Sequence, residues 1–228
     1  PRSFKMAARF QAVGSGVTAP ASTISVAWPT HQIGDLGILV VATAYTSAPT
    51  PSGWTAIVVD SSLGYTLGIY YAFATSSAMG NVTAGQSGHR NNGFIFTIRG
   101  ANGPGSPIGN SSMYSLAAAA SGWQTQAGSI SANGKSCLVC VAGTAGGLTT
   151  NDAIGGWDAG INAGLSGTYI ERQDYTAGGY GIAVGTADLV GGASTVNASV
   201  YLNNSPVDLY EYEFLVNHGS EGNFFSLL

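Results

Sequence analysis

Two cysteines separated by two residues, Cys137 and Cys140, form one recognisable chemical pattern. A C-x-x-C pair serves as a redox-active dithiol or contributes half of a zinc site. Zinc would need two further ligands, and the three histidines lie far away in the sequence, at positions 31, 89 and 218. Residues three apart on a strand point to opposite faces, and the surrounding segment reads as a strand. We therefore expect two unlinked thiols that bind no metal.

Other residue types that could do chemistry lack a telling arrangement. Asp152 and Asp158 lie in a glycine-rich stretch where carboxylates could bind calcium, but the D-x-D-x-D-G pattern is missing. Gly88 directly follows Ser87, which breaks the G-x-S-x-G pattern of a nucleophile elbow. The eleven acidic residues form no recognisable pair for sugar hydrolysis. We expect a protein that is not an enzyme and uses no cofactor.

Four tryptophans and eleven tyrosines are the remaining residues that could bind a ligand. Aromatic faces stack on pyranose rings, and Trp54, Trp123 and Trp157 each follow a glycine in an expected turn. These three residues are candidate ligand-binding aromatics. We favour the alternative, in which each tryptophan closes one end of the protein core, because an indole buries a large area.

The elements that must hold these residues are β-strands. Apolar and polar residues alternate with a period of two, as in Phe94, Phe96 and Ile98, and such alternation is typical of half-buried strands. The alanine-rich run 116–120 could be a helical turn or a strand, and we favour a strand. The glycine-rich stretch 143–168 reads as an extended loop. Strands are expected at 24–28, 38–45, 55–60, 67–74, 94–99, 137–142, 168–175, 180–186, 194–202 and 210–216.

The chain also reads as two similar halves. Residues 34–44 have a weak echo at 134–144, and each copy is followed by a glycine-rich segment with a tryptophan and, later, an apolar strand. We predict an all-β, jelly-roll-like antiparallel β-sandwich in one domain, 20–216, with pseudo-halves 20–100 and 112–216. The segment 101–111, rich in Gly and Pro, separates them. Residues 1–19 are expected to form an N-terminal arm, and 217–228 a C-terminal tail.

Composition favours an assembly. Charged residues make up only 8% of the chain, against about 25% in an ordinary globular domain. A neutral surface rich in Gly, Ser and Asn favours contact with other protein, so we expect a homo-oligomer. No apolar run reaches the roughly 18 residues of a membrane span. The three basic residues near the start are too few for a nucleic-acid footprint.

The two ends are the expected assembly contacts. The first ten residues mix basic and aromatic side chains, and the last five are mostly apolar. Each large apolar group gains about 1.5–3 kcal/mol when a neighbour buries it. The candidate contact residues are Arg2, Phe4, Lys5, Arg9, Phe10, Phe224, Phe225, Leu227 and Leu228.

An ordered set of short motifs resembles a known family. The set comprises Gly34-Asp35-Leu36, Pro51-Ser52-Gly53-Trp54-Thr55, Ile69–Thr75 and Phe94–Gly100, which ends in Arg99-Gly100. It is similar to a repeated β-sandwich module of tailed-bacteriophage virion proteins. The family's closing segment usually ends in arginine-proline, whereas this chain continues with acidic residues, and 217–228 has no counterpart in the family.

The resemblance implies a structural protein of the virion, made in the host cytoplasm, that decorates a capsid or builds a tail or fibre. It also implies a homotrimer that contacts other virion proteins. The alternative is a receptor- or carbohydrate-binding module that uses its aromatic residues on a host-surface glycan. A hydrolase is the third hypothesis.

Overall fold

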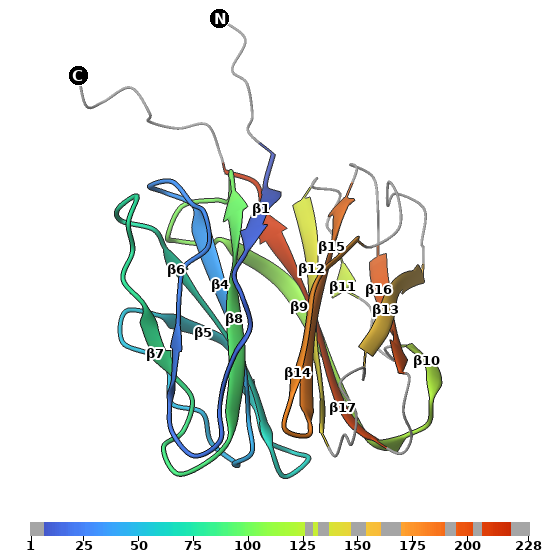
Figure 1. Ribbon diagram of the computed structural model, residues 1–228. Coiled ribbons are helices and arrows are strands. Elements are labelled where there is room, and N and C mark those ends of the chain that lie inside the picture. Colours follow the sequence, from blue (N-terminus) through green and yellow to red (C-terminus); the bar gives the residue numbers. More distant parts are fainter. Residues whose placement is uncertain are drawn as a thin grey trace, which may run out of the picture.

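The computed structural model describes residues 7–125, 130–131, 137–146, 154–160, 170–189, 195–202 and 207–219. Within these residues the secondary structure consists of strands, all pairing antiparallel, with no helix (Figure 1). The predicted all-β sandwich is confirmed. In particular, the described part of the chain contains no helix that could cross a membrane.

The first half builds one large sheet and one small ribbon. Its large sheet has the order β1-β8-β4-β6-β5, with β2 also pairing with β8, and β3 pairs with β7 in the ribbon. The strands are β1 (Arg9–Val13), β2 (Val17–Ala19), β3 (Ile24–Val26), β4 (Leu36–Thr43), β5 (Thr55–Asp60), β6 (Thr66–Phe73), β7 (Val82–Ala84) and β8 (Asn91–Arg99).

The second half repeats this plan. Its large sheet has the order β14-β15-β12-β17-β9, while β16 pairs with β10, β11 and β13 in a smaller sheet. The strands are β9 (Ile108–Ala119), β10 (Gly122–Thr125), β11 (Ile130–Ser131), β12 (Cys137–Gly146), β13 (Ile154–Gly160), β14 (Ile170–Ala177), β15 (Tyr180–Leu189), β16 (Thr195–Leu202) and β17 (Val207–Asn217).

The two large sheets have equivalent strand orders. Read from the other edge, the second sheet runs β9-β17-β12-β15-β14, which matches β1-β8-β4-β6-β5 position by position in chain order. The edge strands of the two sheets even share a bulge, between Ala56 and Val58 in β5 and between Glu171 and Gln173 in β14. The two halves are therefore alike in topology as well as in sequence pattern.

The bulges also give the residue alignment of the halves. Tyr70 of β6 lies opposite the bulge of β5 and pairs on its other side with Leu39 in β4. Gly185 of β15 lies opposite the bulge of β14 and pairs on its other side with Val141 in β12. Leu39 is therefore equivalent to Val141, whereas the sequence echo aligned it with Val139. The structural alignment thus differs from the sequence echo by two residues. Because a strand has a period of two, this shift leaves every position on the same face of its strand.

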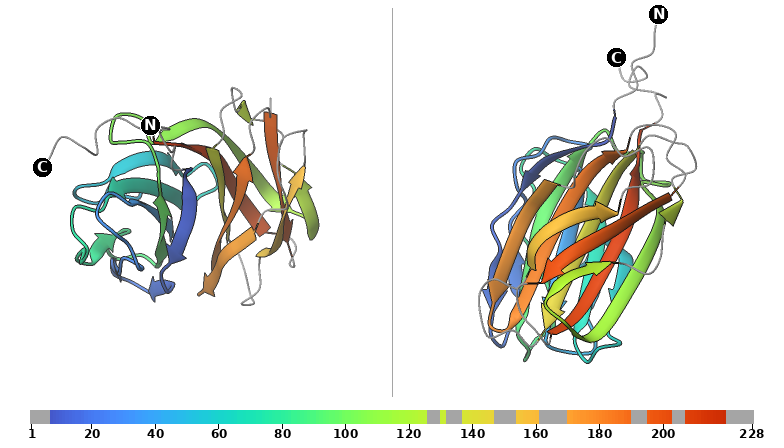
Figure 2. Two further views of the ribbon diagram at one scale, coloured as in Figure 1. Left: turned by 90° about the horizontal axis from the view of Figure 1, so that it is seen from above. Right: turned by 90° about the vertical axis from the view of Figure 1, so that its right-hand side faces the viewer.

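The hydrophobic core lies in layers. The two large sheets pack face to face through residues of β4, β6 and β8 on one side and of β15 and β17 on the other. A second cluster lies between the first large sheet and the β3–β7 ribbon. The smaller sheet of β10, β13 and β16 lies on the far side of the second large sheet (Figures 1 and 2).

Several segments differ from the sequence-based expectation. Strands β1 and β2 lie in the second half of the expected N-terminal arm, because both find pairing partners along β8. The expected loop 143–168 contains the end of β12 and all of β13, so that interpretation is wrong for these residues. Strand β9 begins at Ile108, inside the expected separator. Each of these strands depends on a partner that is distant in sequence.

Candidate functional site: an aromatic cleft and a shared terminal end

A cleft of about 460 Å³ opens on the outer side of the first half. Its walls come from the segment after β3, the turn before β5 and the segment that leads into β7. Its lining residues are Trp28, Pro51, Ser52, Trp54, Met79, Gly80, Asn81, Val82 and Thr83. This volume falls within the range of small-molecule sites. The lining carries no charged side chain, so the cleft is suited to a neutral ligand.

Two indole rings line this cleft side by side. The rings of Trp28 and Trp54 lie 5.3 Å apart with an interplanar angle of 42°, and both side chains are half-buried against the outer core. A Cβ atom on Gly37 would lie 2.3 Å from the Trp28 ring, so only glycine lets this ring lie on β4. The indoles are therefore held in place while part of each remains accessible.

A histidine fixes the outer side of Trp28. The His31 and Trp28 ring centroids are 5.2 Å apart. His31 Nδ1 lies 2.6 Å from the carbonyl oxygen of Pro29, to which it donates, and the amide of Met79 donates to His31 Nε2 at 3.4 Å. In these two contacts Nδ1 is the donor and Nε2 the acceptor. The ring therefore acts as a spacer between two walls of the cleft.

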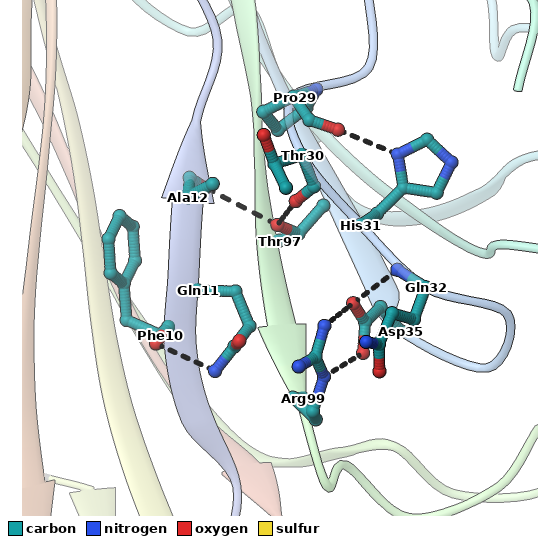
Figure 3. Close-up of polar contacts among 10 residues, drawn as sticks. All are labelled: Phe10, Gln11, Ala12, Pro29, Thr30, His31, Gln32, Asp35, Thr97 and Arg99. Carbon is teal, nitrogen blue, oxygen red and sulfur yellow. Dashed lines mark hydrogen bonds and ion pairs between the residues drawn. The ribbon is translucent and has the colours of Figure 1, made fainter. Parts of the chain in front are cut away.

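An ion pair close to the cleft joins the ends of β4 and β8 (Figure 3). Arg99 donates through Nε to Asp35 Oδ1 at 2.9 Å and through a terminal nitrogen to Oδ2 at 2.8 Å. The amide of Gln32 also donates to Asp35 Oδ2, at 2.8 Å. Both charged residues belong to the motifs that carry the family resemblance. In this molecule the two residues form the Asp35–Arg99 latch, an ion pair that holds the ends of β4 and β8 together.

The pKa of Asp35 reflects this latch. Burial alone would raise the pKa, but the hydrogen bonds from Arg99 and Gln32 and the charge of Arg99 outweigh it and hold the pKa below its ordinary value. Asp35 is therefore ionised and committed to Arg99, which leaves it unsuited to act as a general acid.

A buried carboxylate pair distinguishes the second half. Glu211 and Glu213 on β17 are both fully buried. Neither carboxylate oxygen of Glu211 has a hydrogen-bond partner within the described residues. Burial, reinforced by the charge of Glu213, raises the pKa of Glu211 well above its ordinary value. No group of three or more potential metal ligands forms among the described residues.

The first and last described residues lie close together at one end of the sandwich. The amide of Ala8 donates to His218 Nδ1 at 2.6 Å, and His218 forms a β-bridge with Ala101. The Gly219 amide donates to the Gly100 carbonyl at 2.8 Å. Both described ends therefore leave the same end of the sandwich (Figure 1).

The predicted contact residues divide between described and undescribed parts of the chain. Arg9 is exposed, whereas the Phe10 ring is partly buried beneath the Arg172 guanidinium, 4.3 Å from its centroid. Phe10 is thus a strand residue packed on the core, so it is unavailable as a free arm anchor. The remaining residues lie outside the described part: Arg2, Phe4, Lys5, Phe224, Phe225, Leu227 and Leu228.

The structure does not bring the three predicted tryptophans together. Trp54 lines the cleft, whereas Trp123 on β10 pairs with Tyr201 and Trp157 on β13 pairs with Val200, both on β16 in the second half's smaller sheet. Trp28, which lines the cleft together with Trp54, is not among the three predicted aromatics. The Pro29 that follows it, at a strand end, was the available signal.

Other predicted features fall outside what is described. The backbone of Cys137 and Cys140 forms part of β12, but their side chains lie outside the described part, as does Asp152. Free, metal-free thiols therefore stay a prediction.

Comparison of the chain with family models, with curated proteins and with solved structures finds no match. The resemblance to the virion module therefore rests on the quoted residues alone.

Proposed function

We propose that this chain is a non-enzymatic structural protein of a tailed-bacteriophage particle. It acts as a capsid-decoration protein or as a tail or fibre component, works as a homotrimer, and contacts other virion proteins. It is made in the host cytoplasm and resides in the virion. The ordered motifs around Asp35, Trp54 and Arg99 are the basis for the family part of this proposal.

The observation that carries the proposal is the shared terminal end. Ala8 and His218 are hydrogen-bonded there, so the residues before Ala7 and those after Gly219 continue from one region of the surface. Most of the predicted contact residues belong to these two flanking segments. A single end of the sandwich can therefore present both segments to one neighbouring subunit.

The remainder of the molecule has the properties of a passive scaffold. Both large sheets contribute to one core, so the halves stabilise each other. The formal net charge is only −4 over 228 residues, which gives weak electrostatic repulsion between copies. Such a chain is suited to close packing within a particle.

Light scattering on the full chain tests the oligomeric state. We expect a mass of three times 23.0 kDa. Removing residues 220–228 should reduce assembly and leave the thermal unfolding temperature unchanged. The deletion starts at 220 because Asn217 and His218 take part in backbone pairing that closes the sandwich. A full-length chain that runs as a monomer contradicts the homotrimer.

Mass spectrometry of purified particles tests the location. Particles from a host that produces this chain should contain it in stoichiometric amounts. If it is found only in the infected-cell lysate and never in the particles, the virion role is wrong.

A further inference from the structure

The Trp28–Trp54 cleft has the features of a built binding site, and its chemistry selects a ligand class. Two indoles, whose rings are flat and apolar, line a hollow of about 460 Å³. Hydroxyl and amide side chains from Ser52, Asn81 and Thr83 line the same hollow. A ligand that fits must itself combine an apolar face with polar groups.

The two indoles are held in place before any ligand arrives. Gly37 gives the Trp28 ring room on β4, and His31 packs on the same ring. Gly53 adopts a φ of 80° in the turn that ends at Trp54, where the Trp54 amide donates to Pro51 at 3.1 Å. Glycine adopts this backbone conformation without strain. A rigid platform loses little conformational entropy on binding.

The rim offers neutral hydrogen-bonding groups. Asn81 donates through Nδ2 to Ser25 at 3.0 Å, which fixes its amide and makes the carbonyl oxygen the acceptor that remains. Ser52 and Thr83 carry hydroxyls that both donate and accept. With no carboxylate, guanidinium or ammonium group in the lining, an ionic ligand would find no partner.

We propose that the Trp28–Trp54 cleft binds a neutral pyranose unit of an oligosaccharide or polysaccharide. The ring's axial C–H face lies on the indoles, and its hydroxyls exchange hydrogen bonds with the rim. Because the lining contains no carboxyl group, the bound sugar leaves unchanged. This site is additional to the particle role proposed above and does not depend on it.

Isothermal titration of the full chain tests the site. The probes are neutral oligosaccharides of glucose, galactose, mannose and N-acetylglucosamine, with oligogalacturonate and oligosialic acid, in which every sugar unit is charged, as comparisons. We expect at least one neutral probe to bind at millimolar concentration or below and the charged probes to bind more weakly. The proposal fails if no neutral probe binds, or if the charged probes bind as tightly as the neutral ones.

Variants locate the binding. Trp54→Ala should weaken it by about tenfold or more, and Ser52→Arg should do the same by filling the cleft from an exposed position. Because Trp54 also packs on the core, Ser52→Arg decides the matter if Trp54→Ala does not fold. The matched control is Tyr45→Ala, which removes an exposed aromatic ring stacked 4.1 Å from His89 outside the cleft. Binding that survives Ser52→Arg, or that is lost equally in Tyr45→Ala, overturns the assignment.

Discussion

The first and second halves of this molecule have matching strand orders, yet equivalent positions carry different chemistry. In the first half, Asp35 and Arg99 form a bidentate ion pair at the ends of β4 and β8. The equivalent residues are Cys137 and Asn217, which face each other in the β12–β17 register and carry no opposite charges. A strand order can therefore be kept without its ion pair, provided that the strand-to-strand register persists.

The same contrast holds for the cleft. Gly37 leaves room for the Trp28 ring, and its equivalent in the second half is Val139. At position 37 any Cβ would meet the Trp28 ring, so an indole can lie flat on β4 only because the residue there is glycine. Equivalent positions of the two halves thus differ in sequence at the point that admits the indole, although the strand order is common to both.

The outer cores differ as well. Ile95 on β8 belongs to the apolar cluster beneath the β3–β7 ribbon, and its equivalent on β17 is Glu213. Gly93 is likewise replaced by Glu211. The second half therefore buries two carboxyl groups where the first buries none at these positions, and burial of a carboxylate opposes folding.

Breaking the latch should have the largest effect on the first half. We expect Asp35→Ala to lower the free energy of unfolding by about 3 kcal/mol, because the Arg99 guanidinium loses its buried partner. Chemical denaturation measures this loss. Asn217→Ala, at the position equivalent to Arg99, should lower it by about 1 kcal/mol or less. Equal losses in the two variants would remove the contrast between the halves.

The latch also predicts a pH dependence. The pKa of Asp35 is lower in the folded chain than its ordinary 3.8, so its stabilisation is complete above that pH and is lost as the pH falls through the folded value. The difference between wild type and Asp35→Ala should therefore shrink on acidification. If the stability difference between wild type and Asp35→Ala stays constant at low pH, the charge of Asp35 is not its source.

Filling the space under Trp28 should have the next largest effect. We expect Gly37→Ala to destabilise the fold by about 2 kcal/mol, because the new Cβ forces the ring away from β4. Near-ultraviolet circular dichroism should show the displaced indole, and saccharide binding should weaken in parallel. Unchanged stability together with an unchanged aromatic spectrum would show that a methyl group at position 37 does not displace the Trp28 ring.

Neutralising the buried carboxyl in the second half should stabilise the protein. The pKa of Glu211 is raised in the folded chain, so its unfavourable effect is absent below the ordinary value of 4.5 and grows as the pH rises toward the folded value. Glu211→Gln should therefore raise the unfolding temperature at neutral pH and leave it unchanged in acid. Glu171→Gln removes the same charge at an exposed position and should raise the unfolding temperature at neutral pH by less than Glu211→Gln does.

The smallest effect is expected at the bulge. The bulged residue is Ile57 in β5 and Arg172 in β14, and Arg172 lies over the Phe10 ring contributed by the first half. We expect Arg172→Met to lose about 1 kcal/mol of stability. The substitution keeps the aliphatic stem and removes both the guanidinium over the Phe10 ring and its 2.8 Å hydrogen bond to Thr186 Oγ1. If Arg172→Met is as stable as wild type, the apolar stem alone accounts for the contact.

The alternation of side chains predicted much of the fold, because its period is local. Phe94, Phe96 and Ile98 mark β8, and Tyr212 and Phe214 mark β17, from their own segments alone. The same reasoning missed β13 and the start of β9. Those strands are rich in Gly, Ser and Ala, which show little contrast between faces, and their pairing with β16 and β17 makes them strands.

The amino-acid sequence by itself determined the strand-rich halves, their order and the residues of the latch motif, since these depend on neighbours along the chain. Tertiary structure alone decided that Trp28 meets Trp54, that Asp35 meets Arg99, and that Ala8 reaches His218. It also decided that Glu211, which lies between Tyr210 and Tyr212 along its strand, is buried. The reason is that sheet stacking brings together residues that are remote in sequence, and the alternation pattern carries no information on which layer covers each face.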